Sequence, residues 1–384
     1  MKILMVSMFS NHFFRWTEQL KDSGHEIYWL DVFDSNTRGE KIDFVQQIIG
    51  WRQKIKYPGR YAIKHQLPRL YDYINSFNQR QLSDVFEGKL KEIQPDVVHS
   101  FVMYSACVPI LEIIKKHPEI KWIYSAWGND LFFYQNNAQM LQDMKSVFPR
   151  MDYMFADCAR DFIIAKRHGF DGEYLGNYPG GGGYVLDNYN KYIKEHIERN
   201  IILIKGYQHT FGRGNNILEA VSSLKKKLST YEIVVFGTHQ TIFDFVESSE
   251  KLSSMENLKL IGQVSHDEVL ELMGKAVIYI GNSISDGTPN TLLEAIIMEV
   301  FPIQSNPGGA TAEIIEHDKN GLLIDEPEDS DEIAALILKA IGNPELIMKG
   351  IAYNTANIRP RLERKYIQKQ VLEKYKLVED NLKR

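Results

Sequence analysis

The chain has 384 residues, a formal net charge of −5 and a hydrophobic fraction of 44%. Its length exceeds one ordinary hydrophobic core and predicts two domains, while its acidic balance excludes a protein that holds nucleic acid through overall charge. The two cysteines form no CxxC pair, and no apolar run reaches the ~18 residues of a membrane span. We therefore expect a reduced, cytoplasmic protein that starts with a domain and not with a signal peptide.

Short apolar segments alternate with helical patterns in the first half of the chain. Strands are expected at residues 2–8, 25–32, 95–100, 121–125 and 151–156. This alternation is typical of a doubly wound α/β sheet. The turn after the first strand holds Ser10 and Asn11 but no GxGxxG, which argues against a dinucleotide at this place. The turn is either a loop that contacts an acceptor substrate or a plain connection.

Residues 51–69 combine cations with aromatic side chains and contain no acid. The cations are Arg52, Lys54, Lys56, Arg60, Lys64 and Arg69. Such a segment suits a surface that meets anionic lipid head groups or a phosphorylated acceptor. The alternative is a solvated face whose aromatic residues, such as Trp51 and Tyr57, turn to the core.

A polar turn follows the strand expected at 121–125, and it contains Gly128, Asn129 and Asp130. Ligands of open α/β sheets lie beyond the carboxyl ends of the strands. Asp130 is therefore a candidate for a polar contact to an acceptor, or for its base; the alternative is a helix N-cap. Four glycines at 180–183 then break regular structure and predict a loop near a domain boundary.

The second half opens with an apolar strand at 201–204 and repeats the alternation of strands and helices. The loop after this strand carries Lys205 and Arg213 among glycines. Cations between a strand and a helix suit the binding of a diphosphate. The alternative is a pair of surface cations on a loop.

The next two expected strands end in turns on the same side of a parallel sheet. Gly237 and Thr238 follow the first of these strands, and Val264 follows the second. Ser265 is a good N-cap for the helix that comes next. The two turns are candidates for contacts to a nucleotide.

The stretch 276–315 predicts a buried strand, a polar loop, a helix and a second strand. Thr288 is placed to cap the helix, and Pro289 suits its first position because the missing N–H would be unpaired there. The amides of Asn290 and Thr291 then point out of a positively polarised helix start. Such a helix start is an anion-binding site.

Two carboxylates flank this predicted anion site. Asp286 lies on the loop beside Gly287, and Glu294 lies one turn into the helix. A ligand that carries both phosphates and hydroxyls, such as a nucleotide sugar, fits that combination.

The spacing of the two acids resembles the donor-site signature of retaining glycosyltransferases of family 4, which have the GT-B fold. Their signature is a Glu, seven residues and a second Glu; here Asp286 stands first and Glu294 second. The resemblance is strongest over roughly residues 200–345. Arg213 stands where the family usually has Lys, and Tyr207 where it usually has Arg. Trp127 stands where many members have His.

The resemblance implies two Rossmann-like α/β domains that face each other across a cleft, with a C-terminal helix that crosses back to the first. The expected parts are an acceptor domain at 1–190, a donor domain at 191–360 and the C-terminal helix at 361–384. It also implies metal-independent, retaining transfer from a nucleoside-diphosphate sugar, expected to be a UDP-sugar. The acceptor would be a hydroxyl of a saccharide or lipid-linked saccharide, as in surface polysaccharide or glycoconjugate synthesis, and no cofactor is needed.

The resemblance assigns roles within the second half. Arg213 and Lys205 neutralise the diphosphate on the helix start, and Glu294 accepts the ribose hydroxyls. Asp286 holds the sugar together with the backbone near Thr288. The turn at Val264 holds the base through backbone contacts.

Other functions stay open at this point. A non-catalytic subunit that binds a nucleotide sugar, or an epimerase or phosphorylase on the same fold, would share much of this pattern. HExxH, clustered Cys/His, GxSxG and GxxxxGK[ST] are all absent, so neither a metal site, a nucleophile-elbow hydrolase nor a P-loop enzyme is predicted. The sequence leaves the donor sugar, its base and the acceptor open, and the expected place is the cytoplasm or the inner membrane face.

Overall fold

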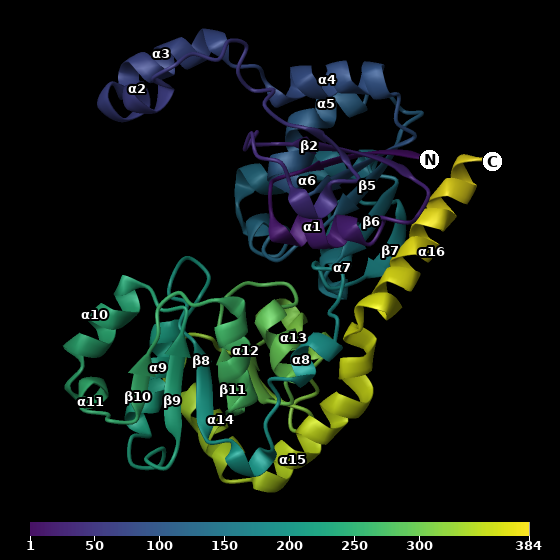
Figure 1. Ribbon diagram of the computed structural model, residues 1–384. Helices are drawn as coiled ribbons and strands as arrows, with labels where there is room; N and C mark the ends of the chain where they lie inside the picture. The colour runs from purple at the N-terminus through teal and green to yellow at the C-terminus, as the bar shows by residue number, and fades with distance from the viewer. Residues whose placement is uncertain (384) are drawn as a thin grey trace. The chain divides into compact units, whose positions relative to one another are not determined.

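The computed structural model describes residues 1–383, apart from the side chain of Tyr61; Arg384, the last residue of the expected C-terminal helix, lies outside the described residues. The chain forms two compact units (Figure 1). The first comprises Met1–Ala156, Phe162–Gly182 and the chain from Gln368 onward, and the second Asp157–Asp161 and Gly183–Ile367. The predicted domain limits at 190 and 360 stay predictions, because compact units do not show which parts fold on their own.

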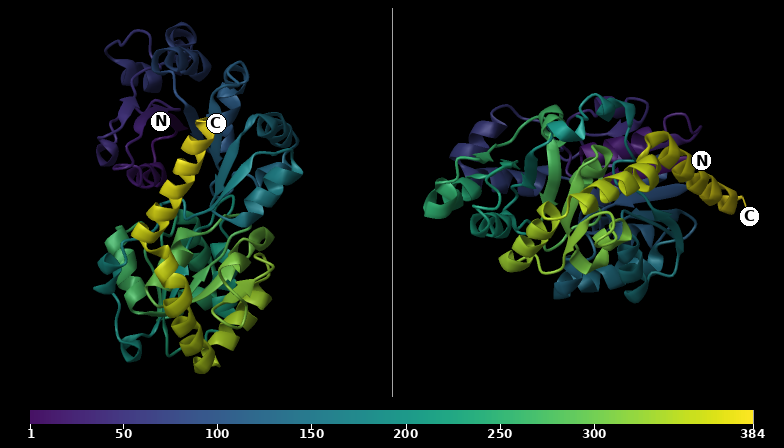
Figure 2. Two further views of the ribbon diagram at one scale, coloured as in Figure 1. Left: turned by 90° about the vertical axis from the view of Figure 1, so that its right-hand side faces the viewer. Right: turned by 90° about the horizontal axis from the view of Figure 1, so that it is seen from below.

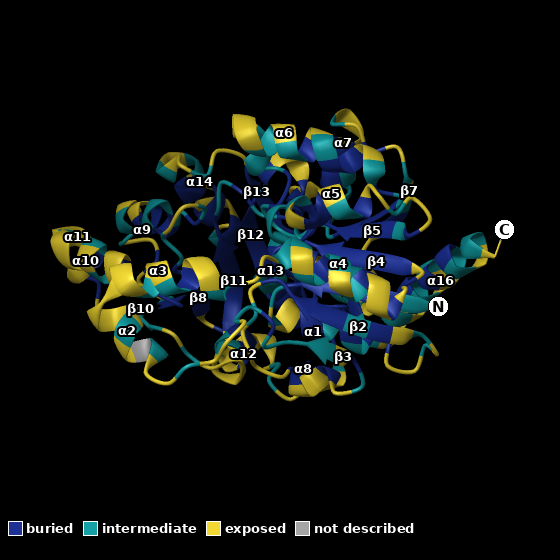
Figure 3. Ribbon diagram, turned by 90° about the horizontal axis from the view of Figure 1, so that it is seen from above, coloured by how far each residue is buried: buried dark blue, intermediate teal, exposed yellow. Residues whose placement is uncertain are grey.

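The first unit is built on a seven-stranded parallel sheet in the order β3-β2-β1-β4-β5-β6-β7. The strands are β1 Lys2–Ser7, β2 Glu26–Asp31, β3 Gln46–Ile48, β4 Val97–Phe101, β5 Lys121–Ser125, β6 Tyr153–Ala156 and β7 Glu173–Asn177. The inner strands are buried almost throughout (Figure 3), as expected for a parallel sheet with both faces covered. β3 and β7 were not predicted, since neither is a continuous apolar run.

Seven helices connect these strands in the described part of the first unit or at its margin. They are α1 Asn11–Glu18, α2 Arg60–Gln66, α3 Pro68–Asn78, α4 Leu82–Ile93, α5 Leu111–Ile114, α6 Ala138–Val147 and α7 Ala159–Arg167. Helices α2 and α3 form a hairpin that extends away from the sheet (Figure 1). The hairpin is not part of the repeating strand–helix pattern and was not predicted.

The second unit is built on a six-stranded parallel sheet in the order β10-β9-β8-β11-β12-β13. The strands are β8 Ile201–Lys205, β9 Glu232–Phe236, β10 Leu258–Leu260, β11 Ala276–Gly281, β12 Phe301–Ser305 and β13 Leu322–Ile324. The chain runs outward from β8 to one edge, returns to β11 beside β8, and then runs to the other edge. The reversal lies between β8 and β11, and such a reversal opens a crevice at the carboxyl ends of the two strands.

The helices of the second unit follow the same alternation. They are α8 Asp187–Asn190, α9 Gly214–Ser223, α10 Gln240–Ser248, α11 Glu250–Ser253, α12 His266–Gly274, α13 Asn290–Ile297, α14 Ser330–Ile341 and α15 Pro344–Tyr353. Helix α12 starts as predicted, because Ser265 and Glu268 form a capping box. Two parallel sheets covered by helices confirm the predicted α/β fold class.

The C-terminal helix α16, Arg364–Leu382, begins in the second unit and returns to the first at Gln368 (yellow in Figure 2). In the first unit its Tyr375 is fully buried, and the hydroxyl lies 3.2 Å from Nε1 of Trp16 and 2.7 Å from Nδ1 of His99. Burial keeps the pKa of His99 well below its usual range, so the imidazole is neutral. The predicted return of the C-terminal helix is therefore confirmed. The buried hydrogen bonds of Tyr375 with Trp16 and His99 fix the helix in the first unit. Among the described residues, no helix combines the length and apolar character needed to cross a membrane.

Candidate active site

The crevice at the reversal of the second sheet is the place where this fold binds ligands. The register pairs Ile204 of β8 with Ile280 of β11, so the loops that follow the two strands leave the sheet side by side. Both loops are rich in small and polar residues, unlike the continuous apolar strands that precede them. The crevice is therefore lined by the two segments that the sequence predicted to bind a diphosphate.

The two loops are joined by backbone hydrogen bonds. The amide of Ile284 donates to the carbonyl of Phe211 at 2.9 Å, and the amide of Arg213 donates to the carbonyl of Asn282 at 3.1 Å. A further bridge links Gly212 with Ser283. The cationic loop and the acidic loop therefore form a single surface, which the sequence could not predict.

The start of helix α13 differs from the prediction by one residue. The helix begins at Asn290, and Pro289, with an extended ψ of 126°, is its N-cap. The predicted cap by Thr288 is wrong, because its hydroxyl donates instead to the carbonyl of Asp157 at 2.7 Å. The prediction of Pro289 at the first helical position is also wrong, because a ψ of 126° is not helical. Among the described residues, the amides of Asn290 and Thr291 have no hydrogen-bond partner, so the helix start keeps two free donors.

The side chains at this helix start are held by two tyrosine hydroxyls. The hydroxyl of Tyr184 donates to Oδ1 of Asn290 at 2.9 Å, and that of Tyr279 donates to Oγ1 of Thr291 at 2.8 Å. Fixed side chains leave the two amides oriented without a cost at the moment of binding. A helix start with two free amides held in this way suits an anion.

Lys205 ends β8 beside this surface. In the described part of the chain its ammonium makes no hydrogen bond or ion pair, and it lies 4.5 Å from the ring centroid of Tyr207. Burial lowers the pKa of Lys205, while the carboxylates of Asp286 and Glu294 are close enough to oppose that shift. The ring face of Tyr207 therefore orients Lys205. An ammonium that is partly removed from water and has no ion pair becomes more stable when an anion joins it.

Arg213 forms an ion pair and hydrogen bonds within the second unit. Its Nε lies 2.7 Å from a carboxylate oxygen of Glu328, and Nη1 donates to the carbonyls of His209 and Gly212 at 3.2 and 3.0 Å. The guanidinium is thus held at the edge of the loop by a carboxylate of the same unit. Glu328 was not predicted, and nothing in its sequence surroundings points to Arg213.

The two acids of the signature lie in different environments. Glu294 is 6% exposed, and its Oε1 lies 2.7 Å from Nε2 of His266, which is largely exposed. Asp286 is half-buried, and its carboxylate accepts the amide of Gly287 at 2.9 Å. Both acids are positioned by the protein itself, and His266 is a neighbour that the sequence did not predict.

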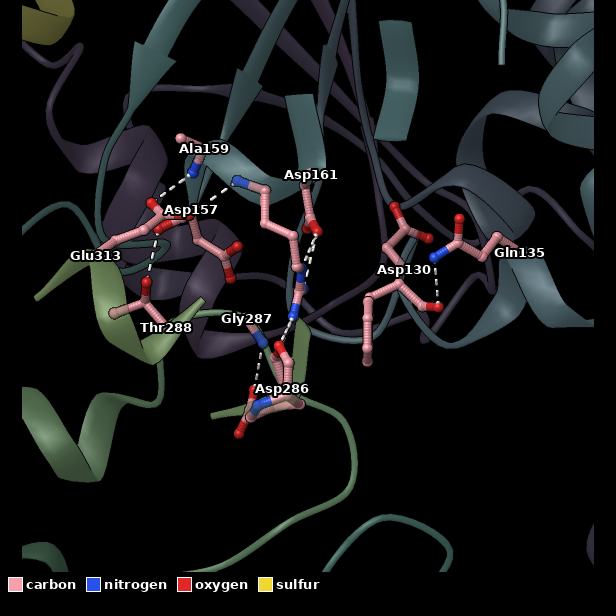
Figure 4. A network of polar contacts seen from close by, with 12 residues as sticks. Asp130, Gln135, Asp157, Ala159, Asp161, Asp286, Gly287, Thr288 and Glu313 are labelled. Carbon is pink, nitrogen blue, oxygen red and sulfur yellow. Dashed lines mark hydrogen bonds and ion pairs between the residues drawn. The ribbon is translucent and has the colours of Figure 1, made fainter. Parts of the chain in front are cut away.

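A cluster from the first half of the sequence holds the acidic loop from the other side (Figure 4). Arg160 is 7% exposed, and its Nη1 donates to the carbonyls of Asp286 and Pro307 at 2.8 and 2.7 Å. Its Nε and Nη2 donate to Oδ1 of Asp161 at 3.0 and 2.8 Å. The backbone of the loop that carries the first acid is therefore clamped by a buried guanidinium.

The rest of this cluster, residues 157–161, fits closely around the loop. The carboxylate of Glu313 accepts the amides of Ala159 and Arg160 at 2.7 and 2.8 Å. A Cβ at Gly287 would lie 2.6 Å from Cγ of Asp157, so only glycine fits there. Burial raises the pKa of Asp161, against the effect of the guanidinium beside it. The sequence missed this cluster, since only a short charged run after a strand could have marked it.

The two predicted nucleotide turns are hydrogen-bonded to each other. Gly237 has a φ of 67°, and its amide donates to the carbonyl of Gly262 at 3.1 Å. The hydroxyl of Thr238 donates to the carbonyl of Ile261 at 2.9 Å. Val264, two positions beyond Gly262, is half-buried. A Cβ at Gly237 would meet the ring of Tyr207 at 2.7 Å, which ties this turn to the cationic loop.

The acceptor-side candidates lie in the first unit. Ser10 caps α1 by accepting the amide of Phe13 at 3.2 Å, and Asn11 is the first residue of that helix. The turn after β5 has Gly128 in the left-handed region, with a φ of 57°. In the described residues, the buried amide oxygen of Asn129 has no hydrogen-bond partner.

Asp130 is buried, and its carboxylate accepts the amide of Met103 at 2.8 Å and the hydroxyl of Tyr124. The alternative of a helix N-cap is wrong, since no helix begins at Leu131. Next to Met103, Val102 has a φ of 72°, which costs a β-branched residue about 1–3 kcal/mol. Asp130 therefore stabilises a strained turn at the end of β4, beside the reversal of the first sheet between β1 and β4.

Comparisons with known proteins agree with this geometry. Residues 193–356 match the family described as glycosyl transferases group 1. The whole chain is similar to the structure of sucrose-phosphate synthase from Thermosynechococcus elongatus, with a TM-score of 0.74, 13% identity and 99% of both chains covered. It is also similar to HepE of Anabaena in complex with UDP-glucose, with a TM-score of 0.67, 12% identity, and 98% of this chain and 99% of that chain covered.

A third similar structure is the lipopolysaccharide outer core galactosyltransferase WaaB in its apo form, with a TM-score of 0.69, 15% identity, and 98% of this chain and 99% of that chain covered. These likenesses establish the fold, which is that of the GT-B glycosyltransferases. The family match covers the unit in which the two hydrogen-bonded loops and the start of α13 lie. The chain is therefore an enzyme, a glycosyltransferase of the GT-B type whose second unit carries a glycosyl transferases group 1 domain.

Proposed function

We propose that the enzyme transfers a sugar from a UDP-sugar to a hydroxyl of a saccharide or lipid-linked saccharide, with retention of configuration and without a metal ion. The diphosphate lies on the amides of Asn290 and Thr291, and Lys205 neutralises it. Glu294 accepts the ribose hydroxyls, and Asp286 holds the sugar. The base contacts the turns at Gly237 and Val264. A donor of this type is present in the Anabaena structure named above.

The observation that carries this proposal is that Lys205 has no ion pair in the part of the chain that the structure describes and lies beside the start of α13. The ammonium of the partly buried Lys205 has no ion pair in the described residues and stands beside a helix start with two free amides. Positive charge aimed at the leaving diphosphate lowers the barrier, because the charge that develops on departure is stabilised without reorganisation. A nucleoside diphosphate is the leaving group that this arrangement fits.

The positive charges of the protein that are proposed to hold the diphosphate also support metal independence. The described residues do contain one group whose ligand atoms lie within 4.8 Å of one another, Asp157, Cys158 and Asp161. Arg160 already donates to Asp161 there, and burial keeps the thiol of Cys158 protonated by raising its pKa. We assign the neutralisation of the diphosphate to protein cations.

Segment 51–69 supports the lipid-linked form of the acceptor. Its cations lie on the first unit, and several of them are exposed. Anionic head groups attract such a segment. We therefore propose that the enzyme works at the inner face of the membrane, in the synthesis of a surface polysaccharide or glycoconjugate.

A panel of UDP-, GDP- and dTDP-sugars tests the proposed function. Incubation with the correct donor should release the nucleoside diphosphate slowly, and faster with a hydroxyl acceptor. The rate should be the same with EDTA as without it, and NMR of the product should show the donor's anomeric configuration. Dependence on a divalent cation contradicts metal independence, and an inverted anomer contradicts retention.

Arg213 is expected to contribute to the transition state through its positive charge. Arg213→Ala should lower kcat by about 10²-fold or more, the cost of removing one preorganised charge donor. Glu328→Gln is the matched control, because it breaks the 2.7 Å ion pair but keeps the cation. Equal losses in steady-state kinetics for both variants would show that the ion pair matters and not the charge facing the diphosphate.

The lowered pKa of Lys205 predicts an alkaline limit to donor use. Lys205 neutralises the diphosphate only in its protonated form, and burial shifts its pKa below that of an ordinary lysine. The pH profile of kcat/KM should therefore be flat in the neutral range and fall as pH rises through this lowered pKa. His209 does not interfere, since burial and Lys205 lower its pKa and keep it neutral there. Lys205→Arg should remove the alkaline fall, because arginine stays charged; an unchanged profile contradicts the assignment.

A further inference from the structure

The first unit contains a pocket of about 320 Å³ that the proposed sugar transfer does not use. It is formed by the loop after β2 and the segment that leads into α2. The residues that line it are Asp34, Asn36, Gly50, Arg52, Gln53, Lys56, Tyr57, Gly59 and Arg60. Three of them are cations, and the lining segment 50–60 leads into α2, the first helix of the α2–α3 hairpin.

The cations of the pocket are not neutralised by the protein. Neither the guanidinium of Arg52 nor the ammonium of Lys56 makes a hydrogen bond or ion pair in the described residues. Arg60 donates to the hydroxyl of Tyr71 at 3.0 Å and, with the amide oxygen of Gln53 turned toward it, to that oxygen at 2.8 Å. These contacts orient Arg60 and leave its charge in place.

Asp34 is the acid of the pocket. Its carboxylate accepts the amides of Gly50 and of Arg52, the latter at 2.6 Å. The carboxylate therefore serves to fold the loop. The pocket as a whole keeps an excess of positive charge.

The loop that carries these cations is fixed in place. Trp51 is buried, and its Nε1 donates to the carbonyl of Asp31 at 2.8 Å. The amide of Lys54 donates to the carbonyl of Asn78 at 2.8 Å, and thus joins the loop to the end of α3. The hydroxyl of Tyr57 is buried against the pocket without a hydrogen-bond partner in the described residues. A preformed cationic pocket with a spare hydroxyl suits a phosphate group.

An exposed apolar face lies on the same hairpin. Leu70, Tyr73 and Phe77 of α3 are 45%, 65% and 65% exposed, and their spacing places them on one side of the helix. Leu67, at the tip between α2 and α3, is 54% exposed. Two of the rings, Tyr73 and Phe77, contact each other with centroids 5.2 Å apart. Apolar side chains gathered in this way on a surface mark a site that interacts with an apolar partner or a membrane.

The geometry points to a lipid whose head group carries a phosphate as the partner of this hairpin. The phosphate enters the pocket and is held by Arg52, Lys56 and Arg60, and the apolar face of α3 enters the boundary of the acyl chains. A lipid surface supplies both the anion and the apolar cover, whereas a soluble phosphate ester supplies only the first. The inference rests on the proposed membrane contact of segment 51–69 and assigns it a binding pocket and an insertion surface.

Cosedimentation of the full-length protein with vesicles tests this inference. Vesicles of phosphatidylcholine with 30% phosphatidylglycerol are compared with phosphatidylcholine alone, and inorganic phosphate is titrated separately by calorimetry. Arg52→Gln/Lys56→Gln tests the pocket, and Tyr73→Ser/Phe77→Ser tests the apolar face. The matched controls are Lys226→Gln/Lys227→Gln, with the same loss of charge, and Ile197→Ser/Met348→Ser, with the same loss of exposed apolar residues.

The wild type should bind the anionic vesicles, and each test variant should weaken that binding on the order of tenfold or more, while the controls bind like the wild type. Thermal unfolding of each variant verifies that it is folded; where the double pocket variant is not, Lys56→Gln alone replaces it. Binding that is equal in test and control variants overturns the inference. Binding of inorganic phosphate without binding of vesicles also overturns it, in favour of a soluble phosphate ester.

Failure of this inference and failure of the proposed function give different results. If sugar transfer is wrong, no donor of the panel releases its nucleoside diphosphate, although vesicle binding still depends on the pocket. If the lipid site is wrong, a donor is turned over, but the pocket and hairpin variants bind vesicles like the controls.

Discussion

Replacement of Lys205 by alanine is expected to lower kcat/KM for the donor by about 10²–10³-fold, the usual effect of removing one preorganised charge from an anion hole. The variant removes an ammonium that is partly buried and has no ion pair among the described residues. The measurement is release of the nucleoside diphosphate under steady-state conditions. Because the carboxylates of Asp286 and Glu294 interact with this ammonium, its loss also makes the site more negative. Donor binding should therefore weaken together with turnover.

Two control variants make the Lys205 prediction specific. Lys205→Arg keeps the charge and should retain more activity than Lys205→Ala. Lys226→Ala removes a surface lysine of the same unit and should leave the kinetics unchanged. A Lys205→Ala enzyme that turns over its donor at the wild-type rate would rule out the diphosphate role.

Removal of Arg160 is expected to give the largest loss of stability. Arg160→Ala leaves the fully buried carboxylate of Asp161 without its guanidinium and two backbone carbonyls without their donor. Breaking a buried pair from one side costs about 3–5 kcal/mol. Denaturant unfolding should show this loss, and the KM for the donor should rise because the backbone of Asp286 is no longer held.

A double variant separates the charge effect from the clamp on the loop. Arg160→Met/Asp161→Asn removes both charges and should recover part of the stability lost in Arg160→Ala, since no unpaired charge is then buried. The KM for the donor should stay raised, because neither variant can hold Asp286. Recovery of KM together with stability would show that Arg160 does not position the loop.

The fold could be predicted because it depends on local patterns. Strands such as Lys121–Ser125 are short β-branched and aromatic runs between polar turns, and the capping box at Ser265 is written in four consecutive residues. The position of the two candidate loops could be predicted for the same reason, since each follows its strand directly; their binding of a phosphate stays a prediction. The order of the strands was not needed to expect Lys205 and Asn290 close together. The rule that ligands lie beyond the carboxyl ends of parallel strands was enough.

What could not be predicted comes from contacts between distant parts of the chain. The cap prediction at Thr288 was wrong because Asp157, more than a hundred residues earlier, competes for its hydroxyl. Arg160 and Glu328 were missed for the same reason. The N-cap alternative for Asp130 is wrong because its carboxylate stabilises the turn at Met103, and no local pattern marks a strained residue such as Val102. Its contact with an acceptor stays a prediction.

The path of the backbone has a consequence for dissecting this enzyme. Residues Asp157–Asp161 belong to the second compact unit although the sequence on both sides of them belongs to the first. A fragment that starts at Gly183 would contain the whole second sheet but lack Arg160, the residue that holds its acidic loop. A chimera that exchanges halves with another glycosyltransferase must therefore carry this five-residue insert with the C-terminal half, or restore an equivalent arginine in the new partner.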